Sequence, residues 1–297
     1  MSTAIGVDVG GTKTAAGLVD ATGAVRERVI VPTPAADGPG AVLDAIAELA
    51  GRLRGPGVAG VGVGTGGVVD HANGVVVSAT GAMPGWAGTP VAAELARRTG
   101  LPVAVDNDVN AHALGELAFG AARGLDSVLV VAVGTGVGGG VIDGGRLVRG
   151  AHHTAGEVGH VPVPGAEGLP CPCGRTGHLE AIASGPAMAA RYGGGADLRT
   201  VAERAGAGDA RAAAIIAEGG AAAGRAIGGL ANVLDPQAVV VGGGVAEIGE
   251  AYWGPLRAAV RENTLPALAG LEIRPAALRN DAGIAGAAAL MMNGGTA

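Results

Sequence analysis

The segment GVDVGGTKT, residues Gly6–Thr14, is an apolar strand pattern that ends in a glycine-rich turn. When the sequence is aligned with itself at an offset of 123 positions, a similar segment appears. Gly11, Thr12, Gly17, Val19 and Asp20 then align with Gly134, Thr135, Gly140, Ile142 and Asp143. Each copy predicts a hairpin whose turn exposes backbone N–H groups to an anion. The repeat therefore predicts two phosphate-holding hairpins that face one cleft.

The two copies differ at a position that matters for chemistry, because Asp8 in the first corresponds to Val131 in the second. A carboxylate buried at a strand end suits Mg²⁺ or an ordered water, and the alternative is a capped strand end without an ion. The segment lacks the GxxxxGK[ST] spacing of a Walker-type loop. Lys13 is therefore as compatible with solvent as with a nucleotide.

Apolar runs and Ala-rich stretches alternate along the chain, which indicates α/β layering. Strands are expected at Ile5–Val9, Val58–Val63, Val103–Val105, Val128–Val133 and Ala238–Val241. Helices are expected at Gly40–Leu53, Val91–Arg98, Val109–Ala118, Asp209–Val233 and Asp281–Met292, with Asp209 and Asp281 as N-caps.

Composition sets limits on the class of protein. A length of 297 residues favours two domains over one. The net charge of −6 comes without a Lys/Arg cluster, so nucleic acid is not an expected partner. No run of about 18 apolar residues predicts a membrane segment, and no basic leader precedes Asp8. We expect a soluble, cytoplasmic protein.

Other glycine runs carry weaker signals. Two segments match G-x-G-x-x-G, one starting at Gly62 and one at Gly134, but neither has the helix and acidic residue that a dinucleotide site requires. A nicotinamide-dependent oxidoreductase is therefore disfavoured. The run Gly242, Gly243 and Gly244 follows an apolar strand, so its N–H groups could meet a nucleotide at a helix start.

The segment VDNDVNAHALGE places Asp106, Asn107 and Asp108 at a strand end, where a helix should begin. Ligands bind at such strand ends in open α/β folds. A carboxylate there can accept a hydroxyl proton, and a carboxamide can donate to and accept from sugar hydroxyls. Asp108 is the better base candidate, while the alternative is that Asp106 or Asp108 only caps the helix.

Four possible metal ligands cluster between GEVGH and CPCGRTGHLE. The chain has two Cys and six His, and His160, Cys171, Cys173 and His178 fall within nineteen positions. Two thiolates and two imidazoles fill a tetrahedral Zn²⁺ site and leave no position for water, so a structural zinc is expected. The alternative is a reduced loop without metal.

Two acidic residues lie beside these ligands. Glu157 precedes His160 by three positions, and Glu180 follows His178 by two. A metal that clamps the ligands would also hold both carboxylates in place, where they could bind sugar hydroxyls.

Together these segments resemble the ROK family of bacterial sugar kinases, from about Ile5 to Leu290. The motifs, in order, are DVGGTK (Asp8–Lys13), NDVNA (Asn107–Ala111), VGTGVGGG (Val133–Gly140), GEVGH (Gly156–His160) and CPCGRTGHLE (Cys171–Glu180). The resemblance implies two actin-like (ribonuclease H-like) α/β domains with a cleft between them. We expect one domain at residues 1–115 plus about 281–297, and the other at 116–280.

The resemblance also implies roles at matching positions. Asp108 would be the general base for the 6-hydroxyl of a hexose, with Gly67, Asn107, Glu157, His160 and Glu180 around the sugar. Asp8, Lys13 and the turns Gly10–Thr12 and Gly134–Gly136 would hold the phosphates of ATP with Mg²⁺. Gly242, Gly243 and Gly244 would border the adenosine, and His160 would use one ring nitrogen for zinc and the other toward the sugar.

Two departures from the family pattern stand out. His178 occupies the place of a third Cys, which changes the charge of the zinc site but not its coordination number. Gly66-Gly67 replaces a Pro-Gly pair, which removes a φ restraint from a loop expected beside the sugar.

Several alternatives stay open. The expected enzyme is a glucokinase-like ATP:hexose 6-phosphotransferase, with N-acetylglucosamine, N-acetylmannosamine, glucosamine or fructose as other substrates. A sugar-binding regulator without turnover is the alternative of another class. Some relatives are repressors with an added N-terminal helix-turn-helix, but the hairpin begins at Ile5, so we expect no DNA-binding domain. A homodimer or higher homo-oligomer is expected.

Overall fold

The computed structural model describes residues 3–79 and 81–292. Within them the chain forms two compact units. Unit 1 comprises the residues up to Gly124, Gly140–Ala155 and the segment from Ala277, and unit 2 comprises Leu125–Gly139 and Gly156–Ala276. The domain boundaries expected from sequence stay a prediction, and residues 293–297 of the expected terminal segment lie outside the described residues.

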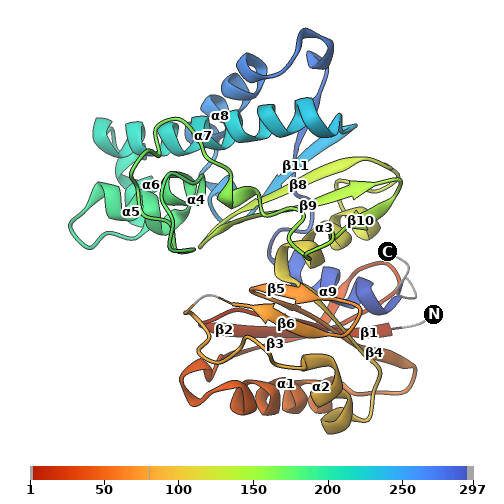
Figure 1. The fold of residues 1–297 in the computed structure, drawn as a ribbon. Helices are drawn as coiled ribbons and strands as arrows, with labels where there is room; N and C mark the ends of the chain where they lie inside the picture. The colour runs from red at the N-terminus through yellow and green to blue at the C-terminus, as the bar shows by residue number, and fades with distance from the viewer. Residues whose placement is uncertain (1–2, 80, 293–297) are drawn as a thin grey trace. The chain divides into compact units, whose positions relative to one another are not determined.

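Unit 1 is built on a five-stranded sheet with the order β3-β2-β1-β4-β7 (Figure 1). Strands β1 and β2 form an antiparallel hairpin, while β1, β4 and β7 are parallel. The strands are β1 (Thr3–Val9), β2 (Lys13–Val19), β3 (Val25–Pro32), β4 (Val58–Thr65) and β7 (Val103–Asn107), and a small hairpin is formed by β5 (Val68–Asp70) and β6 (Val75–Ser78). The helices are α1 (Pro39–Leu53), α2 (Val91–Thr99), α3 (Asp108–Phe119) and α9 (Ala282–Met292).

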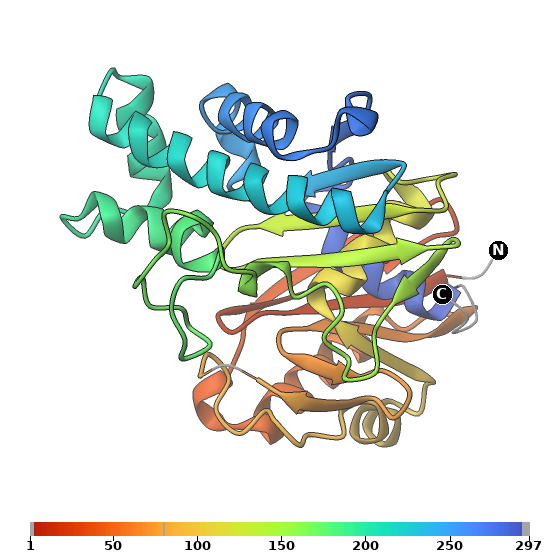
Figure 2. The same ribbon diagram turned by 45° about the horizontal axis from the view of Figure 1, so that its top comes forward.

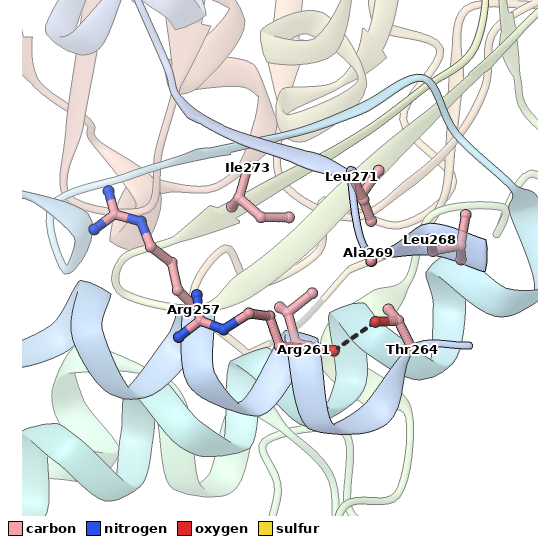
Figure 3. A pocket seen from close by; sticks show the side chains of 8 residues that line it. Arg257, Arg261, Thr264, Leu268, Ala269, Leu271 and Ile273 are labelled. Atoms are coloured by element: carbon pink, nitrogen blue, oxygen red, sulfur yellow. Dashed lines mark hydrogen bonds between the residues drawn. The ribbon is translucent and has the colours of Figure 1, made fainter. Parts of the chain in front are cut away.

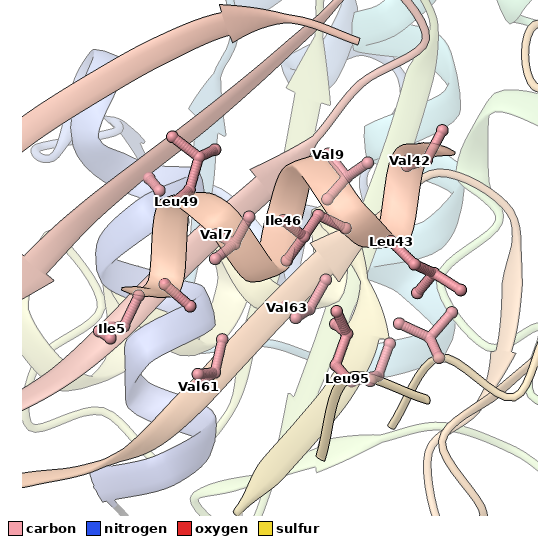
Figure 4. Packing of buried hydrophobic residues seen from close by; sticks show 14 of the residues in the cluster. Ile5, Val7, Val9, Val42, Leu43, Ile46, Leu49, Val61, Val63 and Leu95 are labelled. Carbon is pink, nitrogen blue, oxygen red and sulfur yellow. The ribbon is translucent and has the colours of Figure 1, made fainter. Parts of the chain in front are cut away.

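The two faces of β1 have different residues, because side chains alternate across a strand. Ile5, Val7 and Val9 pack with α1 and α2 in one apolar core (Figure 4). The opposite face carries Ala4 and Gly6, and a Cβ on Gly6 would lie 1.9 Å from the carbonyl oxygen of Ile284 in α9. Glycine therefore lets the backbone of α9 lie directly on the sheet.

The second sheet has the order β10-β9-β8-β11-β12, which is the same succession as in the first sheet. Strands β8, β11 and β12 are parallel, as β1, β4 and β7 are. The bounds are β8 (Val128–Val133), β9 (Val137–Asp143), β10 (Arg146–Val148), β11 (Ala238–Gly242) and β12 (Glu272–Pro275). The repeat that was found in the sequence is therefore a repeat of topology.

The helices of unit 2 include a long pair, α7 and α8, that lie along each other (Figure 2). The helices are α4 (Glu180–Ala183), α5 (Gly185–Tyr192), α6 (Leu198–Gly206), α7 (Ala210–Leu234) and α8 (Glu250–Asn263). Short 3₁₀ turns are η1 (Ala35–Asp37), η2 (Val158–His160), η3 (Ala246–Ile248), η4 (Pro266–Leu268) and η5 (Arg279–Asp281).

The expected α/β fold is confirmed, and each expected strand and helix is present. Asp209 caps α7 as expected, with its carboxylate accepting from the N–H groups of Arg211 and Ala212. Asp281 directly precedes α9, its Oδ1 accepts a hydrogen bond from Arg28, and its role as N-cap stays a prediction. Helix α8 follows the Gly242–Gly244 run, after which a helix start was expected, and it contains Pro255.

Among the described residues, no helix has the length and apolar character needed to cross a membrane.

The contact between α7 and α8 yields a stability prediction. A Cβ on Gly224 would lie 2.3 Å from the Leu256 carbonyl oxygen, whereas a Cβ on Gly229 of the same helix meets nothing within 4 Å. We expect Gly224→Ala to destabilise the protein by about 1–3 kcal/mol, because α8 must move away. Gly229→Ala should stabilise it by about 0.5–1 kcal/mol. Urea unfolding of both variants tests the pair, and equal effects would contradict the packing.

Candidate active site and metal cluster

Three parallel strands of unit 1 end at one edge, and their polar residues form a row. In the ladder, Asp8 of β1 lies opposite Gly64 of β4, and Gly64 lies opposite Asp106 of β7. Asn107 follows opposite Thr65. The carboxyl ends of parallel strands are where open α/β folds bind ligands. Asp8 and the Asp106 segment, about 100 residues apart in sequence, therefore share this edge.

Asp8 is half-buried and lies on the face of β1 that is covered by α9. A Cβ on Gly283 would come within 2.6 Å of the Asp8 Oδ2, so glycine makes room for this carboxylate. Burial raises the pKa of Asp8 above its ordinary value; the charge of His112 opposes this rise and that of Asp108 adds to it. A carboxylate in such surroundings gains from a nearby cation.

Asn107 joins the strand end to α3 and to the loop after β4. Its Oδ1 accepts from the N–H groups of Val109 and Asn110, so it is the N-cap of α3. The expected alternative, a cap by Asp106 or Asp108, is wrong, because Asp108 is already the first residue of the helix. The Asn107 Nδ2 donates to the Gly67 carbonyl at 3.0 Å. Since Nδ2 carries two N–H groups and one donates to Gly67, the amide has a second donor for a ligand.

The Gly66-Gly67 loop is held in place without a proline. Gly67 has φ +103°, and a Cβ there would lie 2.4 Å from the Ser78 carbonyl oxygen, so only glycine fits. The buried indole of Trp86 donates to Thr65 Oγ1 at 3.0 Å, directly before the loop. Packing and hydrogen bonds thus supply the rigidity that sequence analysis left in doubt.

The turn of the first hairpin contains the expected phosphate-binding residues. The Gly10 N–H donates to the Lys13 carbonyl at 3.0 Å and closes the turn, and Thr12 and Lys13 are exposed. Thr33 holds the turn from the side, because its hydroxyl donates to the Gly10 carbonyl at 2.7 Å. Sequence analysis did not identify Thr33, since no local pattern marks it.

The expected nucleotide residues of unit 2 also lie together. Val245 N–H donates to the Val133 carbonyl at 3.0 Å, and a Cβ on Gly243, at φ +87°, would lie 2.3 Å from the same oxygen. The run Gly242–Gly244 therefore lies against the end of β8, where the turn Gly134–Gly136 begins. Glu180 Oε2 accepts from Val137 N–H at 2.8 Å on the other side of that turn.

His160, Cys171, Cys173 and His178 converge as expected. One possible ligand atom from each lies within 4.8 Å of all the others. Cys171 Sγ lies 3.6 Å from His160 Nδ1, and Cys173 Sγ lies 3.3 Å from His178 Nδ1. Ligand atoms around a tetrahedral zinc are about 3.3–3.8 Å apart, and both of these distances lie in that range. Burial raises the pKa of the Cys171 thiol to about 11.

The two ring nitrogens of His160 face different groups. Nδ1 is on the Cys171 side, whereas Nε2 lies 3.6 Å from Glu157 Oε2. The expected division of duties between zinc and sugar stays a prediction. Glu157, His160 and Glu180 thus lie in unit 2, while Gly67, Asn107 and Asp108 lie in unit 1.

A separate hollow of about 210 Å³ lies at the end of α8 (Figure 3). Its lining includes Arg257, Arg261 and Ile273, and it contains none of the residues expected at the site. Arg257 lies over the Trp253 ring and pairs with Glu250. This hollow is therefore not the candidate active site.

Comparisons with known proteins agree over nearly the whole chain. The glucokinase of Halalkalibacterium halodurans is 36% identical over 95% of this chain and 92% of its own. An N-acetylmannosamine kinase of Shigella boydii is 36% identical over 97% of this chain and 98% of its own. A solved structure with the same fold is the ROK family glucokinase of Streptomyces griseus in complex with glucose and AMPPNP. Its TM-score is 0.86, and it is 35% identical over 99% of this chain and 100% of its own. The sequence pattern of the ROK family matches residues 4–293, and the chain belongs to that family.

Proposed function

We propose that this chain is an ATP-dependent hexose kinase that phosphorylates the sugar 6-hydroxyl, with glucose as its first candidate substrate. The observation that carries the proposal is the position of Asp108 as first residue of α3, beside Asn107 and its bond to Gly67. The similarity to glucokinases supports the substrate class.

Asp108 acts as the general base in this proposal. Its carboxylate accepts the proton of the 6-hydroxyl while that oxygen forms a bond to the γ-phosphorus of ATP. The bond from this phosphorus to the β–γ bridging oxygen breaks, and ADP leaves with the electron pair. Asn107 donates from Nδ2 to the sugar. Its Oδ1 accepts from the first N–H groups of α3 and so fixes the backbone of the neighbouring Asp108. Glu157, His160 and Glu180 bind the remaining hydroxyls.

The residues around Asp8 fit an ATP–Mg²⁺ complex. Burial and the charge of Asp108 disfavour the ionised form of the Asp8 carboxyl and raise its pKa, and a bound cation would offset both effects. When bound, Mg²⁺ neutralises charge on the β- and γ-phosphates. Lys13 and the turns Gly10–Thr12 and Gly134–Gly136 would bind phosphate, and Gly242–Gly244 would border the adenosine.

We propose a structural zinc at His160, Cys171, Cys173 and His178. Two thiolates and two neutral imidazoles balance the charge of Zn²⁺, and no position is left for a reacting water. The Nδ1 of His160 is turned to the cluster, so the metal would fix the ring whose Nε2 faces Glu157. The zinc would therefore position His160 and, through it, Glu157 for sugar binding.

The sugar and the class of function are tested by one assay. ADP release and product formation are measured with glucose, N-acetylglucosamine, N-acetylmannosamine, glucosamine and fructose, each with ATP and Mg²⁺. Turnover of at least one hexose is expected. Sugar binding without any product would instead indicate a regulator, and gel filtration would test the expected homo-oligomer.

Removal of the base should abolish most of the turnover. We expect Asp108→Asn to lower kcat by about 10²–10⁴ because the proton acceptor is lost. Hexose binding, measured calorimetrically, should stay within a few-fold, since the Asn107 contacts persist. Asp37→Asn, an exposed acid of the same unit, is the control and should keep full activity. A kcat near that of the wild type would rule out Asp108 as the base.

The loop beside Asn107 gives a matched glycine pair. Gly67→Ala should raise KM for the hexose and reduce stability by about 1–3 kcal/mol, because the Cβ collides with the Ser78 carbonyl. Gly66→Ala should stay close to the wild type, since a Cβ there meets nothing within 4 Å. Kinetics and thermal unfolding measure both, and equal behaviour would contradict a specific role of Gly67.

The zinc proposal predicts about one Zn²⁺ per chain by elemental analysis. Cys171→Ser and Cys173→Ser should lose the metal, lower Tm and raise KM for the hexose. His152→Ala, an exposed histidine outside the cluster, should keep it. A wild-type protein that takes up no zinc when titrated would refute the proposal.

A further inference from the structure

Asp106 is a buried acid that the proposed mechanism does not use. Its side chain is 1% exposed. Asp106 is the penultimate residue of β7 and directly precedes Asn107 and Asp108. Its Oδ1 accepts from the Asn107 N–H at 2.8 Å and from Asn110 Nδ2 at 2.9 Å. One carboxylate oxygen therefore holds the backbone before Asp108 and a side chain in the first turn of α3.

The second carboxylate oxygen of Asp106 binds groups from two other parts of unit 1. Arg149, which follows β10, donates from Nε to Oδ2 at 2.8 Å. His71, which follows β5, places Nδ1 3.5 Å from the same oxygen, and this nitrogen lies 2.8 Å from the Val105 carbonyl. Asp106 thus joins β7, the loop after β5 and the loop after β10.

Both partners of Asp106 lie close in sequence to an expected sugar-binding residue. Gly67, whose carbonyl binds Asn107, lies four residues before His71. The Arg149 carbonyl accepts from the Ala155 N–H at 3.2 Å, and Glu157 follows two residues later. Gly67 and His71 lie on either side of the short strand β5, so Asp106 contacts the chain just after β5 and, through Arg149, the chain eight residues before Glu157.

The exposure of this ion pair separates it from an ordinary surface pair. Arg98 also donates from Nε to an aspartate at 2.8 Å and is 17% exposed, close to the 19% of Arg149. Its partner Asp44, however, is 73% exposed. Burial of a charge pair costs desolvation that its attraction barely offsets, so stability alone is a weak reason for the Asp106–Arg149 pair.

We propose that Asp106, together with Arg149 and His71, is a positioning group for Asn107 and Asp108. Asp106 touches neither substrate nor nucleotide in this account. It acts through the Asn107 N–H and the first turn of α3, and through His71 and Arg149, which are near Gly67 and Glu157 in the sequence. The inference rests on the proposed function, since it assigns to Asn107 and Asp108 the roles of sugar ligand and base.

The test uses variants that break the pair with little change of shape. Asp106→Asn keeps an acceptor for Asn107 and Asn110 but turns an N–H₂ group toward Arg149. Arg149→Met removes the donor and keeps the length of the side chain, and Arg149→Lys keeps the charge without the forked guanidinium. Arg98→Met is the matched control, since it removes an arginine of similar exposure from an aspartate pair of the same unit.

We expect Asp106→Asn and Arg149→Met to lower kcat about 10–100-fold and to raise KM for the hexose, with KM for ATP unchanged. Arg149→Lys should recover part of the loss, and the double variant should be no worse than the poorer single variant. Arg98→Met should match the wild type. All assays are run well below the Tm of each variant, with the folded fraction measured by circular dichroism.

A lower kcat in proportion to the folded fraction, with both KM values unchanged, would show a purely structural role and overturn the inference. Wild-type kcat and KM in Asp106→Asn would overturn it too. Calorimetric hexose binding without ATP separates this result from failure of the proposed function. If the wild type binds hexose without turnover, the kinase proposal fails, and weaker binding by Asp106→Asn alone would still support the positioning role. If the wild type binds no hexose, both proposals fail.

Discussion

The parallel pairing of β1, β4 and β7 is the constraint on which the candidate site of unit 1 depends. Because the three strands are in register to their last residues, Asp8, Gly64 and Asp106 form one row at the sheet edge. The alternation of side chains along β1 then turns Asp8 away from the Val7 core and toward α9. A shift of one residue in β1 would place an apolar side chain at this position.

Glycine makes this arrangement possible at the next level of packing. Cβ atoms at Gly6 and Gly62 would lie 1.9 and 1.7 Å from carbonyl oxygens of α9, so neither position can carry a side chain. A Cβ at Gly64 would meet Ala111 and the Asp108 Cα at 3.1 and 3.5 Å. Helices α3 and α9 therefore lie close over the strand ends, which brings Asp108 and His112 near Asp8. The high glycine content thus has a structural purpose at the site.

Unit 2 achieves local order differently, because its expected sugar and metal residues lie in a segment with little regular structure. Backbone bonds such as Cys171 N–H to the Arg175 carbonyl at 2.8 Å fold that segment tightly. The Cys and His side chains gather at its centre. A metal that binds there would add to the stability of this segment. His160 of this cluster also faces Glu157, so in the proposed function one residue would serve both metal binding and sugar binding.

The sequence by itself determined the features that depend on neighbouring residues: the repeated hairpin, the α/β succession, the Cys/His cluster and the motifs of the ROK family. These signals are local, because turns, strand periodicity and ligand spacing are written in short segments. Only the tertiary structure decided which member of Asp106-Asn107-Asp108 caps α3 and which is buried. That choice depends on Arg149, His71 and Gly67, about 35–43 residues away in sequence, and no local pattern predicts such partners. Burial and long-range hydrogen bonds arise only when the chain is folded, and they give three adjacent polar residues three different environments.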